Sequence, residues 1–170
     1  MKKTIFILSV IFSMIFTKSL IAQGTIVDVA IGNKNFSTLV TALKSADLVG
    51  ALQGNGPFTV FAPTNDAFAK IDSETLNSLL EEKNQKILSN ILTYHVISGK
   101  LAASDVVAAL KKGNGSVELT ALNGQIITVM QKEGKIWLID SKGNYSEISA
   151  TDVMGSNGVI HVIDTVVMPK

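Results

Sequence analysis

The sequence predicts an α+β fold, and three observations lead to this class. Apolar residues recur at helical spacing in the first half of the chain, whereas short β-branched runs bounded by turn residues dominate the second half. The chain has 170 residues, which is the length of one ordinary domain, and 46% of them are hydrophobic, which is too apolar for disorder. Helices that cluster ahead of strands favour α+β over an alternating α/β order.

Residues 1–22 have the order of a secretory signal peptide. Lysines precede an apolar run over residues 5–16, and Ala22 is the expected cleavage position. The run is shorter than the roughly 20 residues that a membrane-spanning helix needs. We therefore expect export, a mature chain of residues 23–170 that forms one domain, and no stable membrane insertion after cleavage. Retention of the leader as an anchor is the alternative. Residues 1–22 resemble the short signal peptides that are common in bacteria.

Five helices are expected, each placed by its apolar spacing or its capping residue, and Thr64 is expected to cap a further short helix after the first strand. Thr25 with Asp28 three residues later forms a capping-box pattern before the first helix. Ser104 is expected to cap the fifth helix. The other three follow from apolar positions at i, i+3, i+4 and i+7. They are a helix with Phe36, Leu39, Val40 and Leu43, a helix over residues 73–81 with Leu76, Leu79 and Leu80, and a helix over residues 85–93 with Ile87, Leu88, Ile91 and Leu92; the fifth covers residues 105–110.

Five strands are expected where turn residues bound short apolar or alternating runs, and a further one at Val96 and Ile97 where the preceding helix ends. The three middle runs are close together in sequence, which predicts an antiparallel meander. The last run is apolar on both faces, which is typical of a central strand. Asn157 and Gly158 are expected to form a tight turn into it because both tolerate positive φ. The runs are residues 58–61, 117–121, 125–131, 136–140 and 159–167.

The composition excludes several kinds of chemistry. All 15 basic residues are lysines, balanced by 14 acidic residues, so nothing directs the chain to nucleic acid. There is no cysteine, and the only histidines are His95 and His161, so a three-histidine metal site is impossible. No nucleophile-elbow or metalloprotease motif is present. We expect no enzymatic activity, no cofactor and no bound metal.

Three strings in the sequence resemble the signature boxes of the fasciclin (FAS1) adhesion domain family. They are TVFAPTNDAF at residues 59–68, NILTYHVISGKL at residues 90–101 and NGVIHVIDTVVMP at residues 157–169. The resemblance covers essentially the whole chain after the leader. It implies a single FAS1 domain with a wedge-shaped β-sandwich flanked by several short helices.

The resemblance also implies residues that contact a partner. In adhesive relatives a tyrosine–histidine pair has been implicated in integrin recognition, and the matching residues here are Tyr94 and His95. A second adhesive feature is an aspartate followed by isoleucine, which Asp152, Val153 and Met154 match with valine in place of isoleucine. The residues themselves allow another interpretation, in which His95, like His161, is a buried neutral imidazole. Asp152 precedes a loop and is expected at the surface.

The expected function is that of an exported, non-enzymatic interaction module that mediates adhesion through contacts with a cell-surface or matrix protein or with a polysaccharide. We expect it in the periplasm, outside the cell or on the cell surface. The alternative that the resemblance implies is a carrier of a small apolar ligand, for example a carotenoid. A hydrolase is the third class.

Overall fold

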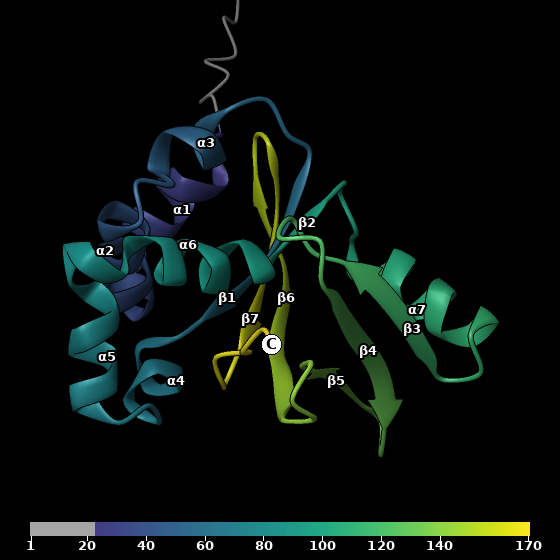
Figure 1. Ribbon diagram of the computed structural model, residues 1–170. Helices are drawn as coiled ribbons and strands as arrows, with labels where there is room; N and C mark the ends of the chain where they lie inside the picture. Colours follow the sequence, from purple (N-terminus) through teal and green to yellow (C-terminus); the bar gives the residue numbers. More distant parts are fainter. Residues whose placement is uncertain (1–22) are drawn as a thin grey trace, which may run out of the picture.

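The computed structural model describes residues 23–170, which form helices and a single sheet (Figure 1). The leader predicted at residues 1–22 lies outside the described residues. The helices are α1 (Ile26–Ile31), α2 (Ser37–Ser45), α3 (Val49–Gln53), α4 (Asn65–Ala69), α5 (Ser73–Leu80), α6 (Gln85–Tyr94) and α7 (Ala103–Lys112), with 3₁₀ turns at Lys34–Phe36 and Glu82–Asn84. The strands are β1 (Phe58–Pro63), β2 (Val96–Ser98), β3 (Ser116–Thr120), β4 (Ile126–Lys132), β5 (Lys135–Ile139), β6 (Tyr145–Gly155) and β7 (Gly158–Ile163).

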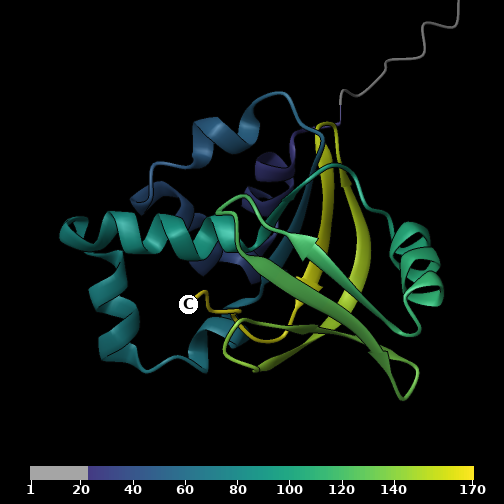
Figure 2. The ribbon, with the colours of Figure 1, turned by 45° about the vertical axis from the view of Figure 1, so that its right-hand side comes forward.

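The sheet has the strand order β2-β1-β7-β6-β5-β4-β3, and β1 pairs with β7 in parallel while the other neighbours are antiparallel. Its two edges approach each other, because Ile97 of the edge strand β2 bridges to Ala121, just after the edge strand β3, and the Leu122 N–H donates to the Val96 carbonyl at 2.8 Å. The sheet is therefore curled into a nearly closed barrel (Figure 2). The α+β class is confirmed, but the expected two-sheet sandwich is not.

Strand β6 explains how one sheet can curl this far, and the sequence analysis missed it. Its pairing with β7 shifts register between Ile148 and Ala150 and again between Ala150 and Val153. Such bulges bend a strand and increase its twist. The bulges also break the regular alternation of buried and exposed residues along this 11-residue strand, which removes the periodic signal of a strand from its sequence.

Two hydrophobic cores lie on opposite faces of β1 and β7. Val60 and Ala62 of β1 and Ile160 of β7 face the helices α1–α6 and form the helix-side core. Phe61 and Ile163, at the alternate positions, point into the curled sheet and form the barrel core, on which α7 also packs. Figure 1 shows α1–α6 on one side of β1 and β7, with the curled sheet on the other. The last apolar run is thus confirmed as a central strand, buried on both faces, although the strand ends at Ile163 and residues 164–167 lie beyond it.

The predicted start of helix α1 is correct, whereas the predicted start of helix α7 is not. The capping box is confirmed, because the Thr25 N–H donates to Asp28 Oδ2 at 2.8 Å and the Asp28 N–H donates to Thr25 Oγ1 at 3.3 Å. The expected cap at Ser104 is wrong, since α7 begins at Ala103. A carboxylate one turn into the helix takes the place of a serine cap there, because the Ala102 N–H donates to Asp105 Oδ2 at 2.9 Å.

Other differences follow from tertiary packing. Helix α3 was not expected from the sequence, and Ile87 of α6 is 54% exposed although its spacing placed it on the apolar face. The remaining residues of that face, Leu88, Ile91 and Leu92, are buried as expected. The three middle strands do form the antiparallel meander that the sequence predicts.

The turn into β7 is present, but the physical reason given for it is wrong. Gly155 pairs with Gly158 across the turn, and neither Asn157 nor Gly158 has a positive φ. The Asn157 amide instead donates to the Leu52 carbonyl at 2.8 Å, while its Oδ1 accepts from the Ile26 N–H at 2.9 Å. A Cβ at position 158 would lie 2.3 Å from the Phe58 carbonyl oxygen, so close approach of β1 requires glycine there.

Candidate partner-binding site

Tyr94 ends helix α6 and is fully buried in the barrel core. Its hydroxyl donates to the Ile126 carbonyl at 2.8 Å and accepts from the Ser141 N–H at 3.1 Å. Burial raises the pKa of Tyr94 above its ordinary value. The side chain therefore ties α6 to β4 and to the turn after β5, and none of it is presented to a partner.

His95 follows Tyr94 and is only 2% exposed. Its Nδ1 lies 2.8 Å from the Ile91 carbonyl, and the Val167 N–H donates to its Nε2 at 3.2 Å. One ring nitrogen must donate and the other must accept, which defines the neutral imidazole protonated on Nδ1. Burial lowers the pKa of His95 to about 4. The interpretation of His95 as a buried neutral histidine is confirmed, and direct contact with a partner would require unpacking of the core.

Asp152 lies at a bulge of β6 and is exposed, as expected. Its φ of 59° is in the left-handed region, which is uncommon for a residue other than glycine but more readily adopted by aspartate. Its Oδ1 accepts a hydrogen bond of 2.8 Å from the N–H of Ala103, the first residue of α7. A carboxylate at this end of the helix also interacts favourably with the helix dipole. Asp152 is thus anchored by this hydrogen bond while the residue remains exposed.

His161 connects the Asp152 bulge to the interior. It is 1% exposed, its Nε2 lies 2.7 Å from the Leu101 carbonyl, and the Asp152 N–H points at its Nδ1 at 3.4 Å. These partners require the neutral imidazole protonated on Nε2. The ring also packs against Phe61, with ring centroids 5.9 Å apart. The expected burial of His161 is confirmed.

The two halves of the expected site do not form one surface. Val153 is half-buried against the helix-side core, and the Met154 carbonyl accepts from the Gln23 side chain at 2.7 Å. Between Asp152 and His95 stand the buried rings of His161 and Phe61, and the Phe61 N–H donates to the His95 carbonyl at 2.9 Å. Only the β6 segment, and within it chiefly Asp152, is available to a partner.

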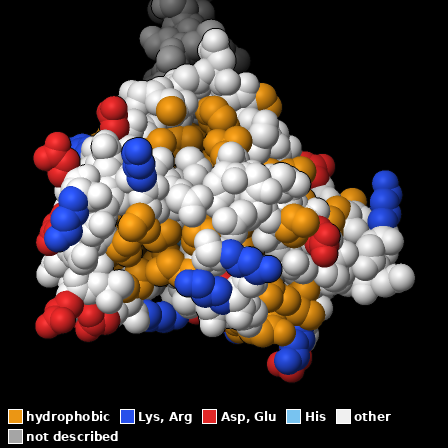
Figure 3. All heavy atoms as spheres, in the orientation of Figure 1, with side chains coloured by type: hydrophobic (Ala, Val, Ile, Leu, Met, Phe, Trp, Pro, Cys, Tyr) orange, Lys and Arg blue, Asp and Glu red, His pale blue; other side chains and the backbone are white. Residues whose placement is uncertain are grey.

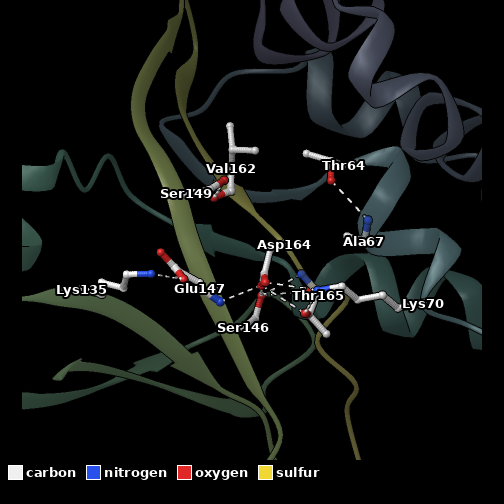
Figure 4. A network of polar contacts seen from close by, with 10 residues as sticks. All are labelled: Thr64, Ala67, Lys70, Lys135, Ser146, Glu147, Ser149, Val162, Asp164 and Thr165. Carbon is white, nitrogen blue, oxygen red and sulfur yellow. Dashed lines mark hydrogen bonds and ion pairs between the residues drawn. The ribbon is translucent and has the colours of Figure 1, made fainter. Parts of the chain in front are cut away.

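A polar network that the sequence analysis did not identify joins β6 to the segment after β7 (Figure 4). Asp164 accepts from the Glu147 N–H at 2.8 Å and from the Lys70 ammonium at 3.1 Å. Burial acts to raise the pKa of Asp164, but these hydrogen bonds and one from Thr165 outweigh it and hold the pKa below its ordinary value. Asp164 lies inside the third signature string, and that position was the only feature of the sequence that could have pointed to the network. Its partners indicate that it fixes the fold.

A small apolar cavity lies between helices α1–α3 and strands β1 and β7. Its volume is about 20 Å³, far below the roughly 300–1,000 Å³ of ordinary ligand pockets. It therefore has no room for a carotenoid. The lining residues are Ile26, Val27, Ala30, Leu39, Leu43, Leu52, Val60, Ala62 and Ile160.

Residues 23–170 contain neither a metal-binding cluster nor a membrane-spanning helix. No group of three or more histidine, aspartate or glutamate side chains there is arranged to hold a metal ion. None of the helices in the same range combines the length and the apolar character that crossing a membrane requires.

The fold defines a class of domain in which a curled seven-stranded sheet contains one parallel pair, packs most of its helices on one side of that pair and has one further helix beside β3. The model of the fasciclin domain family matches residues 34–169, and the chain belongs to this family. Protein sll1483 of Synechocystis is 50% identical over 145 residues, covering 85% of this chain and 73% of that protein. Cell surface glycolipoprotein MPB83 of Mycobacterium bovis is 34% identical over 153 residues, covering 87% and 62%. A solved FAS1 domain pair from the insect cell adhesion molecule Fasciclin I shares the fold, with a TM-score of 0.75 and 21% identity, over 85% of this chain and 51% of that one.

Proposed function

We propose that this protein is an exported, non-enzymatic interaction module that mediates adhesion at a cell surface or matrix through contacts with a protein partner. Membership of the fasciclin domain family supports adhesion, which is the role that the sequence resemblance implies. The name of MPB83, a cell-surface glycolipoprotein, supports a location outside the cytoplasm for this chain too. The signal-peptide-like order of residues 1–22 is an independent observation that supports export.

The observation that carries the proposed contact is the position of Asp152. Its carboxylate is exposed at a bulge, and the hydrogen bond from Ala103 fixes the direction in which it projects. Val153 beside it is half-buried and offers an aliphatic group next to the charge. A firmly held charge beside an apolar anchor loses little conformational entropy on binding, which favours affinity. Backbone strain at an exposed residue is also more common at binding sites than elsewhere.

The test measures retention of cells, or of envelope protein, on immobilised residues 23–170. The Asp152→Asn, Val153→Ala double variant removes the charge and the anchor but keeps a side-chain oxygen for Ala103 and a residue that tolerates positive φ. We expect about thirty-fold weaker retention, since loss of an anchor costs roughly 2 kcal/mol or more. Asp47→Asn, Val49→Ala is the matched control, because Asp47 is also an exposed aspartate with φ 56°. Unchanged retention by the first variant would contradict the proposed contact.

Export and the alternative carrier function are tested by separate measurements. The intact mass of the secreted protein is expected to begin at Gln23, and a mass that includes residues 1–22 would contradict cleavage there. Solvent extraction of the purified protein tests for a carried molecule. A stoichiometric apolar compound in the extract would overturn the adhesion module in favour of a carrier.

A further inference from the structure

The outward face of strands β4–β6 carries an apolar stripe that the proposed contact at Asp152 does not use. Along β4 and β5 the alternate residues Ile127, Val129 and Leu138 are buried in the barrel core. Their neighbours point to the opposite face, where an antiparallel sheet in contact with water normally carries polar side chains. Here five residues of that face are apolar, interrupted by Thr128 between Ile126 and Met130 and by Glu147 opposite Trp137. We call its members the aromatic stripe: Ile126, Met130, Trp137, Ile139 and Tyr145.

Two pairs of stripe members are direct neighbours across the strands. Met130 pairs with Trp137, and Ile139 pairs with Tyr145. The rings of Trp137 and Tyr145 meet edge to face with centroids 6.3 Å apart. Tyr145 is 52% exposed and Ile126, at the other end, is 50% exposed. Partly exposed apolar side chains that include an aromatic pair are typical of an interaction surface.

The figures show that this face is accessible within the described part of the chain. In Figures 1 and 2, α1–α6 lie on the other side of the molecule and α7 lies beside β3. Figure 3 shows hydrophobic side chains gathered over the β4–β5 end of the sheet, with basic and acidic side chains next to them.

Charged and polar groups of both kinds border the stripe. One shallow hollow is lined by Trp137 and Tyr145 together with Lys132 and Glu133. A second hollow continues along the same face. Its lining includes Ile126, Ile139, Glu118, Thr128 and Lys170. The border therefore offers both hydrogen-bond donors and acceptors, without an excess of one charge.

We propose that the aromatic stripe binds a neutral polysaccharide. Sugar rings have apolar C–H faces that stack on aromatic rings, and their hydroxyls both donate and accept, which matches a border with lysines and carboxylates. A strongly charged polymer would meet groups of its own sign on this border, for example Glu118 and Glu133 or Lys132 and Lys170. The stripe has five apolar members, whereas a protein interface of standard size takes roughly 20–30 residues from each side. The two consecutive shallow hollows suit an extended chain better than one compact ligand.

The experiment uses the fact that Trp137 is the only tryptophan of the protein, so its fluorescence reports on the stripe alone. Residues 23–170 are titrated with cellohexaose, xylohexaose and laminarihexaose. At least one is expected to shift the Trp137 emission with a saturating dependence on concentration. Tyr145→Ala is expected to weaken that binding about tenfold or more, because an aromatic neighbour of the bound ring is lost. Ile87→Ala is the matched control, since Ile87 is similarly exposed on α6 away from the stripe.

The outcomes separate this proposal from the adhesion proposal. The Asp152→Asn, Val153→Ala variant is expected to keep the full fluorescence response to sugar even if it no longer retains cells. No response of Trp137 to any of the three sugars, or an equal response in Tyr145→Ala, would overturn the polysaccharide site. Retention of envelope protein that depends on Tyr145, without any sugar response, would also overturn it and would assign the stripe to a protein partner.

Discussion

Asp152 Oδ1 accepts a hydrogen bond of 2.8 Å from the backbone N–H of Ala103, so a residue of strand β6 caps helix α7 from 49 positions away in the sequence. The same residue adopts a left-handed backbone conformation at the bulge where β6 changes register against β7. One exposed side chain therefore has a structural task as well as the proposed contact with a partner. Substitutions at this position must separate the two.

Asp152→Ala is expected to lower the free energy of unfolding by about 1–2 kcal/mol. The loss of a cap at a helix N-terminus typically costs this amount, and alanine tolerates positive φ less well than aspartate. Asp152→Asn is expected to stay close to the wild type, because it keeps the acceptor oxygen. Urea denaturation of both variants measures the difference. Equal midpoints for Asp152→Ala and the wild type would show that the bond to Ala103 contributes nothing to stability.

His95 is expected to make the protein less stable in mild acid. The pKa of His95 is about 4 in the folded protein and about 6.5 in the unfolded chain, so between these values the unfolded state binds more protons. The stability is complete above about pH 6.5 and declines as the pH falls towards 4, by about 3 kcal/mol in total. Denaturation midpoints measured from pH 7.5 to 4 test this.

The control for this pH dependence is His95→Gln. A glutamine amide can donate to the Ile91 carbonyl and accept from the Val167 N–H, but it does not titrate. The variant is expected to lose much of the decline between pH 6.5 and 4. If it declined as steeply as the wild type, another group would be responsible.

His161→Ala is expected to destabilise the fold by about 1–3 kcal/mol. The change leaves the Leu101 carbonyl without its partner and removes the packing of the imidazole on Phe61. Ser149→Ala is a suitable comparison, because Ser149 is exposed on the neighbouring strand and its loss should change stability by less than about 0.5 kcal/mol. Thermal midpoints that coincide for the two variants would contradict a structural role of His161.

Asp164→Ala is expected to cost about 1–3 kcal/mol, because the Glu147 N–H and Lys70 lose a charged acceptor. The pKa of Asp164 is lowered in the fold, so its contribution is complete above about pH 4 and is lost as the pH falls through the folded pKa. The gap between variant and wild type should therefore narrow in strong acid. Lys135→Ala, which removes only an exposed ion pair with Glu147, should cost less than about 1 kcal/mol. Similar losses in both variants at pH 7 would be evidence against the network.

Local patterns in the sequence were sufficient for much of the fold. The capping box at Thr25 and Asp28, the apolar positions of α6 and the meander of β3–β5 depend on neighbours in the chain, and all are present in the structure. The burial of His161 was also predictable, because apolar residues surround it on both sides in the sequence. The signature strings led correctly to the fasciclin domain family.

Features that depend on distant segments could be decided only by the tertiary structure. The bulges of β6 have no periodic signal, and the curling of the sheet depends on contact between its edges at Ile97 and Ala121. Tyr94 and His95 stand where an adhesive pair was expected, but packing turns both side chains inward. Asp152 is held by Ala103, and the members of the stripe around Trp137 come together only after three strands have been aligned. The sequence by itself determined the local elements and the family, whereas tertiary packing determined which side chains remained at the surface, because burial depends on contacts between segments far apart in the chain.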